Sequence, residues 1–242
     1  LAKKNDILYI EDSAQSFGAT AYGRPAGSFS DAAIFSFCQN KVITCFGEGG
    51  AVVTNNEDLK NQINYLRSHG RVEEIGANYF ESTAENEYLY PGYNFRISTV
   101  QAAFGLSQLN NLEEQLSLRR ANAKRYNENL SKFNDVTIPI VPDKFTHCYQ
   151  MYSVQFKNRE TREKVREHLL KNGVHVRVYF EPLHLKKYYV NKYGNKKLPV
   201  SEKLVDTILS LPMYAQLSID QIDYISELIG SSLKDNISCE II

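Results

Sequence analysis

The chain has 242 residues, 43% of them hydrophobic and 23% charged, which is typical of a globular protein with one large domain or two small ones. Its 28 basic and 28 acidic residues balance to a formal net charge of zero, so the charge gives no reason to expect nucleic acid or an anionic membrane as a partner. No run of residues approaches the ~18 apolar positions of a membrane-spanning helix.

The cysteines and histidines show no spacing typical of a metal site or of a disulfide framework. The cysteines are scattered without any C-x-x-C pair, which argues against a structural zinc site and against a disulfide-stapled secreted domain. We therefore expect reduced thiols in a cytoplasmic protein, with no signal peptide and no bound metal. The residues concerned are Cys38, Cys45, Cys148 and Cys239 together with His69, His147, His168 and His175.

Three short apolar runs in the amino-terminal part are typical of strands in an α/β sheet. They are Ile7–Asp12, Ala32–Phe37 and Ala51–Thr54. The first ends in two acids, as a buried parallel strand does when it delivers polar groups at its carboxyl end. Asn56 then precedes a helix that has acids in its first turn, basic residues in its last turn and Gly70 as its stop signal.

The middle of the chain combines a long loop with a long helical pattern. Residues 71–92 lack periodicity, and a loop of about 20 residues inside a compact domain is often functional. Ser98 or Thr99 can then cap a helical pattern that runs to about residue 133. The pattern fits one long helix or two helices joined near Asn110-Asn111.

From Val136 onward the pattern is that of a small α+β unit. Residues 149–156 alternate like a half-buried strand, residues 158–173 form an amphipathic helix closed by glycine, and residues 174–180 read as a second strand. Ser218 and Gln221 open a last helix with a capping box. We therefore expect a sheet-containing domain with an interdomain helix over residues 1–135 and a carboxyl-terminal domain over residues 136–242. The boundary is expected near residues 135–147.

Four polar side chains lie at the predicted strand ends. Asp12 ends the first strand and Gln15 follows it, whereas Ser36 lies within the second strand and Lys41 follows in the apolar stretch "FSFCQNKVITCFGEGG". Strand ends in open α/β sheets face one crevice, where ligands bind. Pyridoxal phosphate (PLP) would use all four groups. An apolar setting favours the neutral amine that forms a Schiff base, a carboxylate keeps the pyridine nitrogen protonated, and the amide and hydroxyl can bond the phenolic oxygen and the phosphate.

Four blocks of the sequence together resemble the sugar aminotransferases of the DegT/DnrJ/EryC1/StrS family. They are "IEDSAQSFGA", "GSFSDAAIFSFCQNKVITCFGEGGAVVTN", "PGYNFRISTVQAAFGLSQL" and "EPLHL" with "LSLPMY", and the resemblance extends over nearly the whole chain. It implies that Asp12 binds the pyridinium nitrogen, Gln15 contacts the ring, Ser36 contacts the phosphate and Lys41 forms the Schiff base with PLP.

The resemblance also implies two further contacts. Asn94 matches a residue that reaches the cofactor phosphate of the neighbouring subunit, which implies a homodimer with shared active sites. Taken alone, an asparagine after Gly-Tyr is also a good turn residue. His184 matches a position near the nucleotide-sugar substrate, and it also reads as a surface histidine. Whether Tyr88, Tyr90 and Tyr93 line a pocket or cover apolar surface stays open.

The family has the aspartate-aminotransferase fold (fold type I of PLP enzymes), with a large α/β sheet domain and a small α+β carboxyl-terminal domain. Its members carry a long amino-terminal portion before the "ED" pair. That portion supplies part of the sheet, a phosphate-binding helix N-terminus and an aromatic residue that stacks on the ring. We therefore expect the large domain to be incomplete on its amino-terminal side and the chain to be a truncated or partly determined enzyme.

The expected activity is PLP-dependent transamination of a nucleotide-linked keto-sugar to an amino-sugar, with glutamate as the amino donor by analogy. The freed amine of Lys41 would act as general base and acid for the 1,3-proton shift. One alternative is a sugar dehydratase of the same family, which carries a histidine where this chain has Lys41. Two others are a catalytically silent fragment or sensor with the same fold, and a plain nucleotide-binding module.

Overall fold

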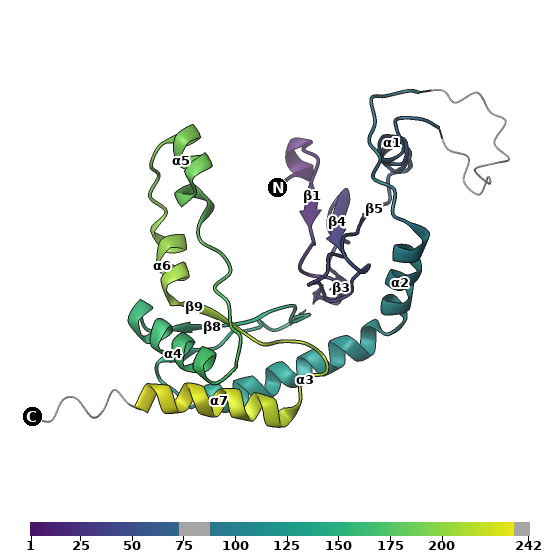
Figure 1. Ribbon diagram of the computed structural model, residues 1–242. Helices are drawn as coiled ribbons and strands as arrows, with labels where there is room; N and C mark the ends of the chain where they lie inside the picture. The colour runs from purple at the N-terminus through teal and green to yellow at the C-terminus, as the bar shows by residue number, and fades with distance from the viewer. Residues whose placement is uncertain (73–87, 235–242) are drawn as a thin grey trace, which may run out of the picture. The chain divides into compact units, whose positions relative to one another are not determined.

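The computed structural model describes residues 1–72 and 88–234 of the chain (Figure 1). They divide into two compact units. The amino unit comprises Leu1–Glu113 and Lys144–Thr146, and the carboxyl unit comprises Glu114–Asp143 and His147–Ile242. No helix of the described ranges is both long and apolar enough to cross a membrane.

The amino unit is built on a three-stranded sheet in the order β1-β4-β5. The strands are β1 (Ile10–Asp12), β4 (Ala32–Ser36) and β5 (Gly50–Thr54), which confirms the three predicted strands, the first of them in a shorter form. β1 and β4 are parallel, whereas β4 and β5 are antiparallel. Helix α1 (Glu57–Arg67) follows β5, and Asn56 caps it by accepting a hydrogen bond from Leu59 N–H at 3.0 Å, as expected.

The two faces of this sheet differ in burial. Asp12 lies opposite Ile34, and Ile34 lies opposite Val52, so these side chains share one face with Ser36 two residues further along β4. This face is open: Ile34 is 40% exposed and Val52 is 43% exposed. On the opposite face Ala33 is buried and the ring of Phe35 lies 5.1 Å from that of Phe17, whereas Val53, opposite Ala33, is 42% exposed.

The prediction that the first strand is buried is therefore wrong for this chain, because Ile10 is 63% exposed. β1 pairs with β4 on one side only, and its Ile10 side chain lies on the open face of the sheet. A strand is buried only when layers cover its faces, and hydrophobic sequence alone does not provide that layer.

A second, small sheet in the amino unit is formed by strands of two residues each. They are β3 (Arg24–Pro25), β2 (Thr20–Ala21) and β7 (Phe145–Thr146), all antiparallel to their neighbours. A 3-10 turn, η1 (Lys3–Asn5), lies near the start of the chain. The loop predicted for residues 71–92 falls mostly outside the described residues.

The long helical pattern forms two helices, one of the two forms that the sequence allows. Helix α2 (Thr99–Asn110) begins with a capping box in which Ser98 and Gln101 bond reciprocally. Helix α3 (Leu112–Leu130) follows directly. Asn111 separates them, and its N–H donates to Gln108 O at 3.2 Å, which ends the first helix.

The carboxyl unit packs three helices with an antiparallel sheet. The sheet order is β6-β8-β9, with β6 (Val136–Thr137), β8 (Tyr152–Phe156) and β9 (Ile208–Leu211). The helices are α3, α4 (Arg159–Lys171) and α7 (Ile219–Lys234), and side chains from all of them meet the sheet in one apolar core. The predicted capping box of α7 is confirmed, because Ser218 and Gln221 exchange hydrogen bonds at 3.0 and 3.2 Å.

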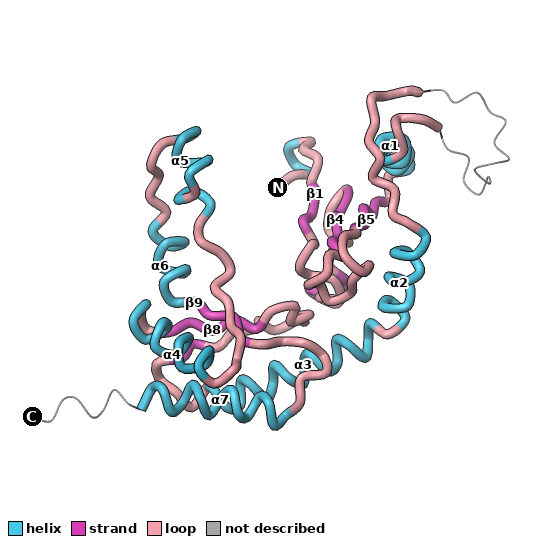
Figure 2. Tube along the Cα trace, in the orientation of Figure 1, coloured by secondary structure: helices cyan, strands magenta, loops and turns pink. Residues whose placement is uncertain are grey.

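Residues 174–180, predicted as a strand, are not one. Figure 2 shows this segment as loop, and its backbone pairs with β9 only at an isolated bridge between Arg177 and Ser210. Val174 and Val176 are buried, so the alternation in the sequence reflects packing on the core edge. The segment then leaves the sheet and reaches η2 (Leu183–Leu185), α5 (Lys187–Tyr193) and α6 (Pro199–Thr207).

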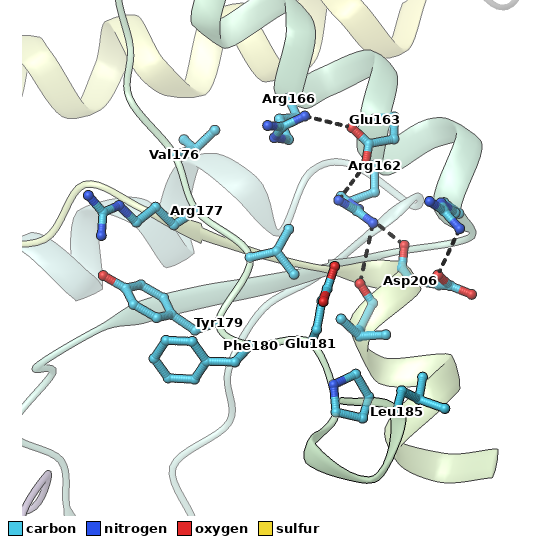
Figure 3. A pocket seen from close by; sticks show the side chains of 14 residues that line it. Arg162, Glu163, Arg166, Val176, Arg177, Tyr179, Phe180, Glu181, Leu185 and Asp206 are labelled. Carbon is cyan, nitrogen blue, oxygen red and sulfur yellow. Dashed lines mark hydrogen bonds and ion pairs between the residues drawn. The ribbon is translucent and has the colours of Figure 1, made fainter. Parts of the chain in front are cut away.

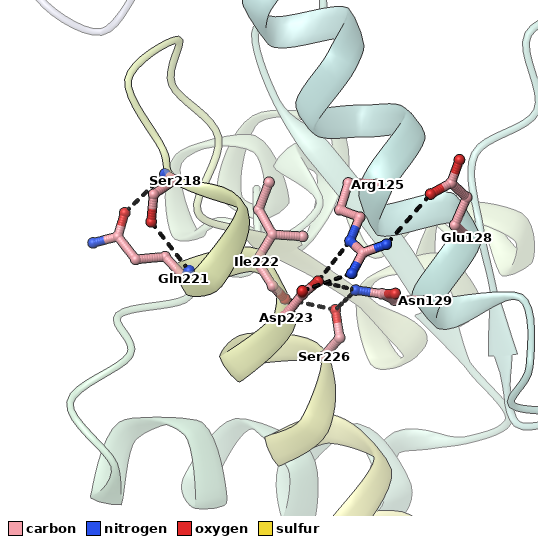
Figure 4. A network of polar contacts seen from close by, with 8 residues as sticks. All are labelled: Arg125, Glu128, Asn129, Ser218, Gln221, Ile222, Asp223 and Ser226. Atoms are coloured by element: carbon pink, nitrogen blue, oxygen red, sulfur yellow. Dashed lines mark hydrogen bonds and ion pairs between the residues drawn. The ribbon is translucent and has the colours of Figure 1, made fainter.

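The compact units divide inside α3, after Glu113, whereas the sequence indicates a domain boundary near residues 135–147. The reason is packing, because Ala123, Tyr126 and Leu130 of α3 belong to the core of the carboxyl unit. Polar contacts also join α3 to α7 (Figure 4).

The centre of these contacts is the ion pair between α3 and α7. Arg125 Nε and Nη2 donate to the two carboxylate oxygens of Asp223 at 2.7 and 2.6 Å. Asn129 Nδ2 donates to Asp223 Oδ1 at 2.7 Å. These hydrogen bonds, the one from Arg125 first, lower the pKa of Asp223 to about 2.

Candidate active site

The carboxyl end of β1 carries two adjacent acids with different surroundings. Glu11 is half-buried: its Oε1 accepts hydrogen bonds from Gly27 N–H at 2.6 Å and from Ser13 Oγ–H at 2.8 Å. Asp12 is exposed on the open face of the sheet, and among the described residues it has one hydrogen-bond partner, Ala14 N–H, which donates to its Oδ1 at 3.1 Å. The strand thus fixes one carboxylate in the fold and leaves the other accessible to a ligand.

The neighbouring strand β4 places Ser36 at the same edge of the sheet. β1 and β4 are parallel, so their carboxyl ends meet there, and Ser36 lies on the face that carries Asp12. Its Oγ accepts a long hydrogen bond from Cys38 N–H at 3.4 Å. Because an oxygen that accepts this bond keeps its own proton, Ser36 can still donate to an anion.

Lys41 lies in the loop that follows β4. Phe37 closes the loop, because Phe37 O accepts from Cys45 N–H at 2.9 Å and Phe37 N–H donates to Gly49 O at 2.7 Å. Val42 and Ile43 beside the lysine are buried. Lys41 itself is half-buried, and its amine makes no hydrogen bond or ion pair with the described residues. Buried apolar neighbours therefore fix the backbone at Lys41, while its amine stays without a hydrogen-bond partner among the described residues.

Helix α2 supports this loop from the other side. Gln101 Nε2 donates to Glu48 O at 3.1 Å, and the rings of Phe46 and Phe104 lie 5.5 Å apart. Gly105 is required by the close approach, because a Cβ there would lie 2.7 Å from Cys45 Sγ. Helix α2 thus packs directly against the loop that carries Lys41.

Of the remaining predicted site residues, Gln15 and Asn94 also lie in the amino unit and His184 lies in the carboxyl unit. Gln15 is exposed three residues after Asp12. Asn94 is exposed in an isolated bridge with Ser68 at the end of α1. His184 lies in η2, where its Nε2 is 2.9 Å from Glu202 Oε1. Asp12 and Ser36 therefore lie at the carboxyl ends of two paired parallel strands, and Gln15 and Lys41 follow these strands along the chain.

Sequence reasoning missed a cavity of about 770 Å³ in the carboxyl unit (Figure 3). Its lining includes four arginines and three acids. Arg162 and Arg166 both bond to Glu163, at 2.6 and 3.0 Å, whereas the side chain of Arg177 makes no hydrogen bond or ion pair with the described residues. The polar lining residues are Arg159, Arg162, Glu163, Arg166, Arg177, Tyr179, Glu181 and Asp206. The arginines come from two separate segments, "NRETREKVREH" and "VRVYF". The periodicity of the sequence therefore gave no sign that they line one cavity.

The donor set at the β1–β4 edge fits PLP. An exposed carboxylate, a hydroxyl that can donate and an uncommitted amine are the three groups that a pyridine nitrogen, a phosphate and an aldehyde need. The open face that carries Asp12 and Ser36 leaves the carboxylate within reach of a ligand.

Comparisons with known proteins agree with the sequence blocks. The profile of the DegT/DnrJ/EryC1/StrS aminotransferase family matches residues 1–230. A GDP-perosamine synthase of Escherichia coli O157:H7 is 33% identical over 235 residues, which cover 97% of this chain and 61% of that protein. A dTDP-3-amino-3,4,6-trideoxy-alpha-D-glucose transaminase of Micromonospora megalomicea subsp. nigra is 34% identical over 236 residues, covering 95% and 59%.

Solved structures show the same relationship. A DegT DnrJ EryC1 StrS aminotransferase from Brucella abortus superposes with a TM-score of 0.82 at 32% identity, covering 95% of this chain and 58% of that one. A Helicobacter pylori aminotransferase involved in the biosynthesis of pseudoaminic acid gives 0.86 at 26% identity, covering 97% and 62%.

The chain thus has the mixed α/β fold of these enzymes and spans about three-fifths of the length of the relatives that it matches. The family match covers the β1–β4 edge, the Lys41 loop and the carboxyl unit up to residue 230 in α7. The chain belongs to the DegT/DnrJ/EryC1/StrS aminotransferase family.

Proposed function

We propose that this protein is a PLP-dependent transaminase that converts a nucleotide-linked keto-sugar into an amino-sugar. The observation that carries the proposal is the presence in the amino unit of an exposed Asp12 carboxylate at the end of β1 and of a Lys41 amine, after β4, that makes no hydrogen bond or ion pair with the described residues. The relatives support the substrate class, because their names include a GDP-sugar synthase and a dTDP-sugar transaminase.

Each residue at the edge has a task in this proposal. PLP, when bound, supplies an electron sink for the substrate carbanion. Asp12 would hold a proton at the pyridine nitrogen, Ser36 would donate to the phosphate and Gln15 would contact the ring. The amine of Lys41 would bind the aldehyde carbon and, once released, move a proton between the substrate carbon and the cofactor carbon.

The expected assembly and fold type follow from the resemblance to the family. The protein would be a cytoplasmic homodimer of fold type I, with a large sheet domain over residues 1–135 and a small domain over residues 136–242. Asn94 would reach the phosphate in the neighbouring subunit, and His184 would contact the nucleotide-sugar. Glutamate would be the amino donor.

The test is to label the Schiff-base lysine. The protein is incubated with PLP, reduced with borohydride, digested and mapped by mass spectrometry. We expect the pyridoxyl group on Lys41 at near-full occupancy, and Lys41→Arg should remove it. Lys60 on α1 is a matched control in the same digest, because it is paired with Glu57 at 2.7 Å.

Labelling spread equally over Lys41 and surface lysines such as Lys60 would contradict the proposal. Asp12→Asn separates cofactor binding from chemistry, because the Schiff base should still form while transamination is lost. Unchanged transamination in this variant would remove Asp12 from the proposed role.

A further inference from the structure

His184 is held by a carboxylate eighteen residues further along the chain. Its Nε2 lies 2.9 Å from Glu202 Oε1, and the same oxygen accepts a hydrogen bond from Leu198 N–H at 2.8 Å. The His184 side chain is only 11% exposed. One oxygen of Glu202 therefore ties the histidine of η2 to the first turn of α6.

The protonation of this pair follows from the surroundings of Glu202. The hydrogen bond from His184 comes first among the causes that lower the pKa of Glu202, and the bond from Leu198 N–H adds to it. The ammonium of Lys197 acts in the same direction. An ionised carboxylate can only accept hydrogen bonds, so the proton shared with the ring belongs to Nε2 of His184.

The turn that carries His184 is itself ordered by the backbone. Leu185 N–H donates to Pro182 O and Lys186 N–H donates to Leu183 O, both at 3.0 Å. The charged neighbours on this turn, Glu181 and Lys186, bond to each other and leave the ring to Glu202. The ring thus has one anchored nitrogen, whereas its Nδ1 makes no hydrogen bond with the described residues.

We infer that Glu202 is a positioning residue that fixes His184 as the Nε2–H tautomer, so that Nδ1 is presented as an acceptor for a hydroxyl or ammonium donor of the substrate. The part about substrate rests on the proposed function, in which His184 contacts the nucleotide-sugar. Neutral imidazole carries one donor and one acceptor, and the group bound to one nitrogen decides the role of the other. In the neutral form, a ring held in this way selects ligands that carry a hydrogen-bond donor at Nδ1.

The tautomer can be measured without cofactor or substrate. The full chain is labelled with ¹⁵N-histidine, and long-range ¹H–¹⁵N spectra are recorded about two pH units above the ordinary imidazole value of ~6.5. His184→Asn assigns the signals. We expect one His184 tautomer with its proton on Nε2, while exposed His175 serves as the internal reference for a free ring.

Two variants separate orientation from charge. Glu202→Ala should shift His184 toward the tautomer mixture of His175, and Glu202→Gln should retain the Nε2–H form, because an amide oxygen can accept both bonds. A proton on Nδ1 of His184 in the unaltered protein would overturn the inference. So would an unchanged tautomer in Glu202→Ala.

Kinetics tests the link to substrate separately. In the PLP-loaded enzyme, Glu202→Ala should raise KM for the nucleotide-sugar about tenfold, as expected for one lost hydrogen bond, with a smaller change in kcat. Glu202→Gln should restore most of the loss. The expected tautomer together with an unchanged KM would overturn the substrate part. If the enzyme has no transaminase activity at all, the proposed function fails, and the tautomer measurement still decides the role of Glu202.

Discussion

Two neighbouring carboxylates at the end of β1 differ in their contacts, and their substitution should differ in effect. Glu11→Ala should lower the free energy of unfolding by about 2 kcal/mol, because Gly27 N–H and Ser13 Oγ lose a charged acceptor. Asp12→Ala should change it by less than about 0.5 kcal/mol, as for other exposed side chains. Urea denaturation followed by circular dichroism measures both. Equal losses in the two variants would contradict this division of roles.

At the residue scale, the sequence indicated where candidate site residues lie along the strands better than it indicated which side chains they bond to. It predicted that Asp12, Gln15, Ser36 and Lys41 share one sheet edge, because strand ends in α/β folds meet there. The parallel pairing of β1 and β4 agrees with this for Asp12 and Ser36, whereas a common site for all four residues stays a prediction. Their roles toward PLP stay predictions. Glu11 was missed, although two successive acids on a strand must face opposite sides.

Glu202 was missed for a different reason. Its link to His184 joins a 3-10 turn to the start of a helix across eighteen residues, and no periodicity in the sequence relates such elements. A charged partner of this kind is set by the tertiary fold, so only coordinates reveal it.

At the scale of elements, the close approach of α2 to the Lys41 loop can be tested with a double-mutant cycle. Gly105→Ala alone should lower the free energy of unfolding by about 1–2 kcal/mol, because the new Cβ would lie 2.7 Å from Cys45 Sγ in a buried site. In a Cys45→Ala background the same change should be neutral or stabilising, since alanine is a better helix former than glycine by about 1 kcal/mol.

Chemical denaturation of the four proteins gives the interaction energy of the cycle. If the effect of Gly105→Ala is the same in both backgrounds, the helix does not depend on this contact. The Schiff-base labelling of Lys41 in the same variants would then report whether the loop keeps its shape when its support is altered.

Elements with strong end signals were predicted well. Asn56, the Ser98–Gln101 pair and the Ser218–Gln221 pair each cap the helix expected, because a side chain that satisfies free N–H groups acts locally. The segment 174–180 was predicted wrongly as a strand. Alternating burial there comes from packing on a core edge, and a strand requires a ladder of backbone bonds that the sequence alone cannot establish.

At the scale of the whole molecule, the domain boundary expected near residues 135–147 stays a prediction, and the compact units of the structure divide within α3, after Glu113. α3 continues the helical pattern of α2 in the sequence, but its buried side chains belong to the carboxyl core. The hydrophobic pattern of the sequence changes near Val136, whereas the two compact units divide after Glu113. A boundary inside a helix leaves no composition signal.

The two units differ in the size of their apolar cores, and this difference predicts which unit unfolds locally more often. The described apolar residues buried in the amino unit are small or few, namely Ala32, Ala33, Val42, Ile43 and Cys45, while the carboxyl core contains many large side chains such as Tyr152 and Ile222. Local opening costs more where more apolar area is buried. Without PLP, the amide protons of β8 and β9 should therefore exchange more slowly than those of β4 and β5, by tenfold or more for each ~1.4 kcal/mol of extra opening free energy. Hydrogen–deuterium exchange with mass spectrometry measures this, and equal protection of β4 and β8 would show that the two units open as one.

Because Asp12, Ser36 and Lys41 all lie in the less protected unit, PLP should slow exchange at the β1–β4 edge and leave β8 nearly unchanged, as a ligand that binds only the closed form stabilises the part it contacts.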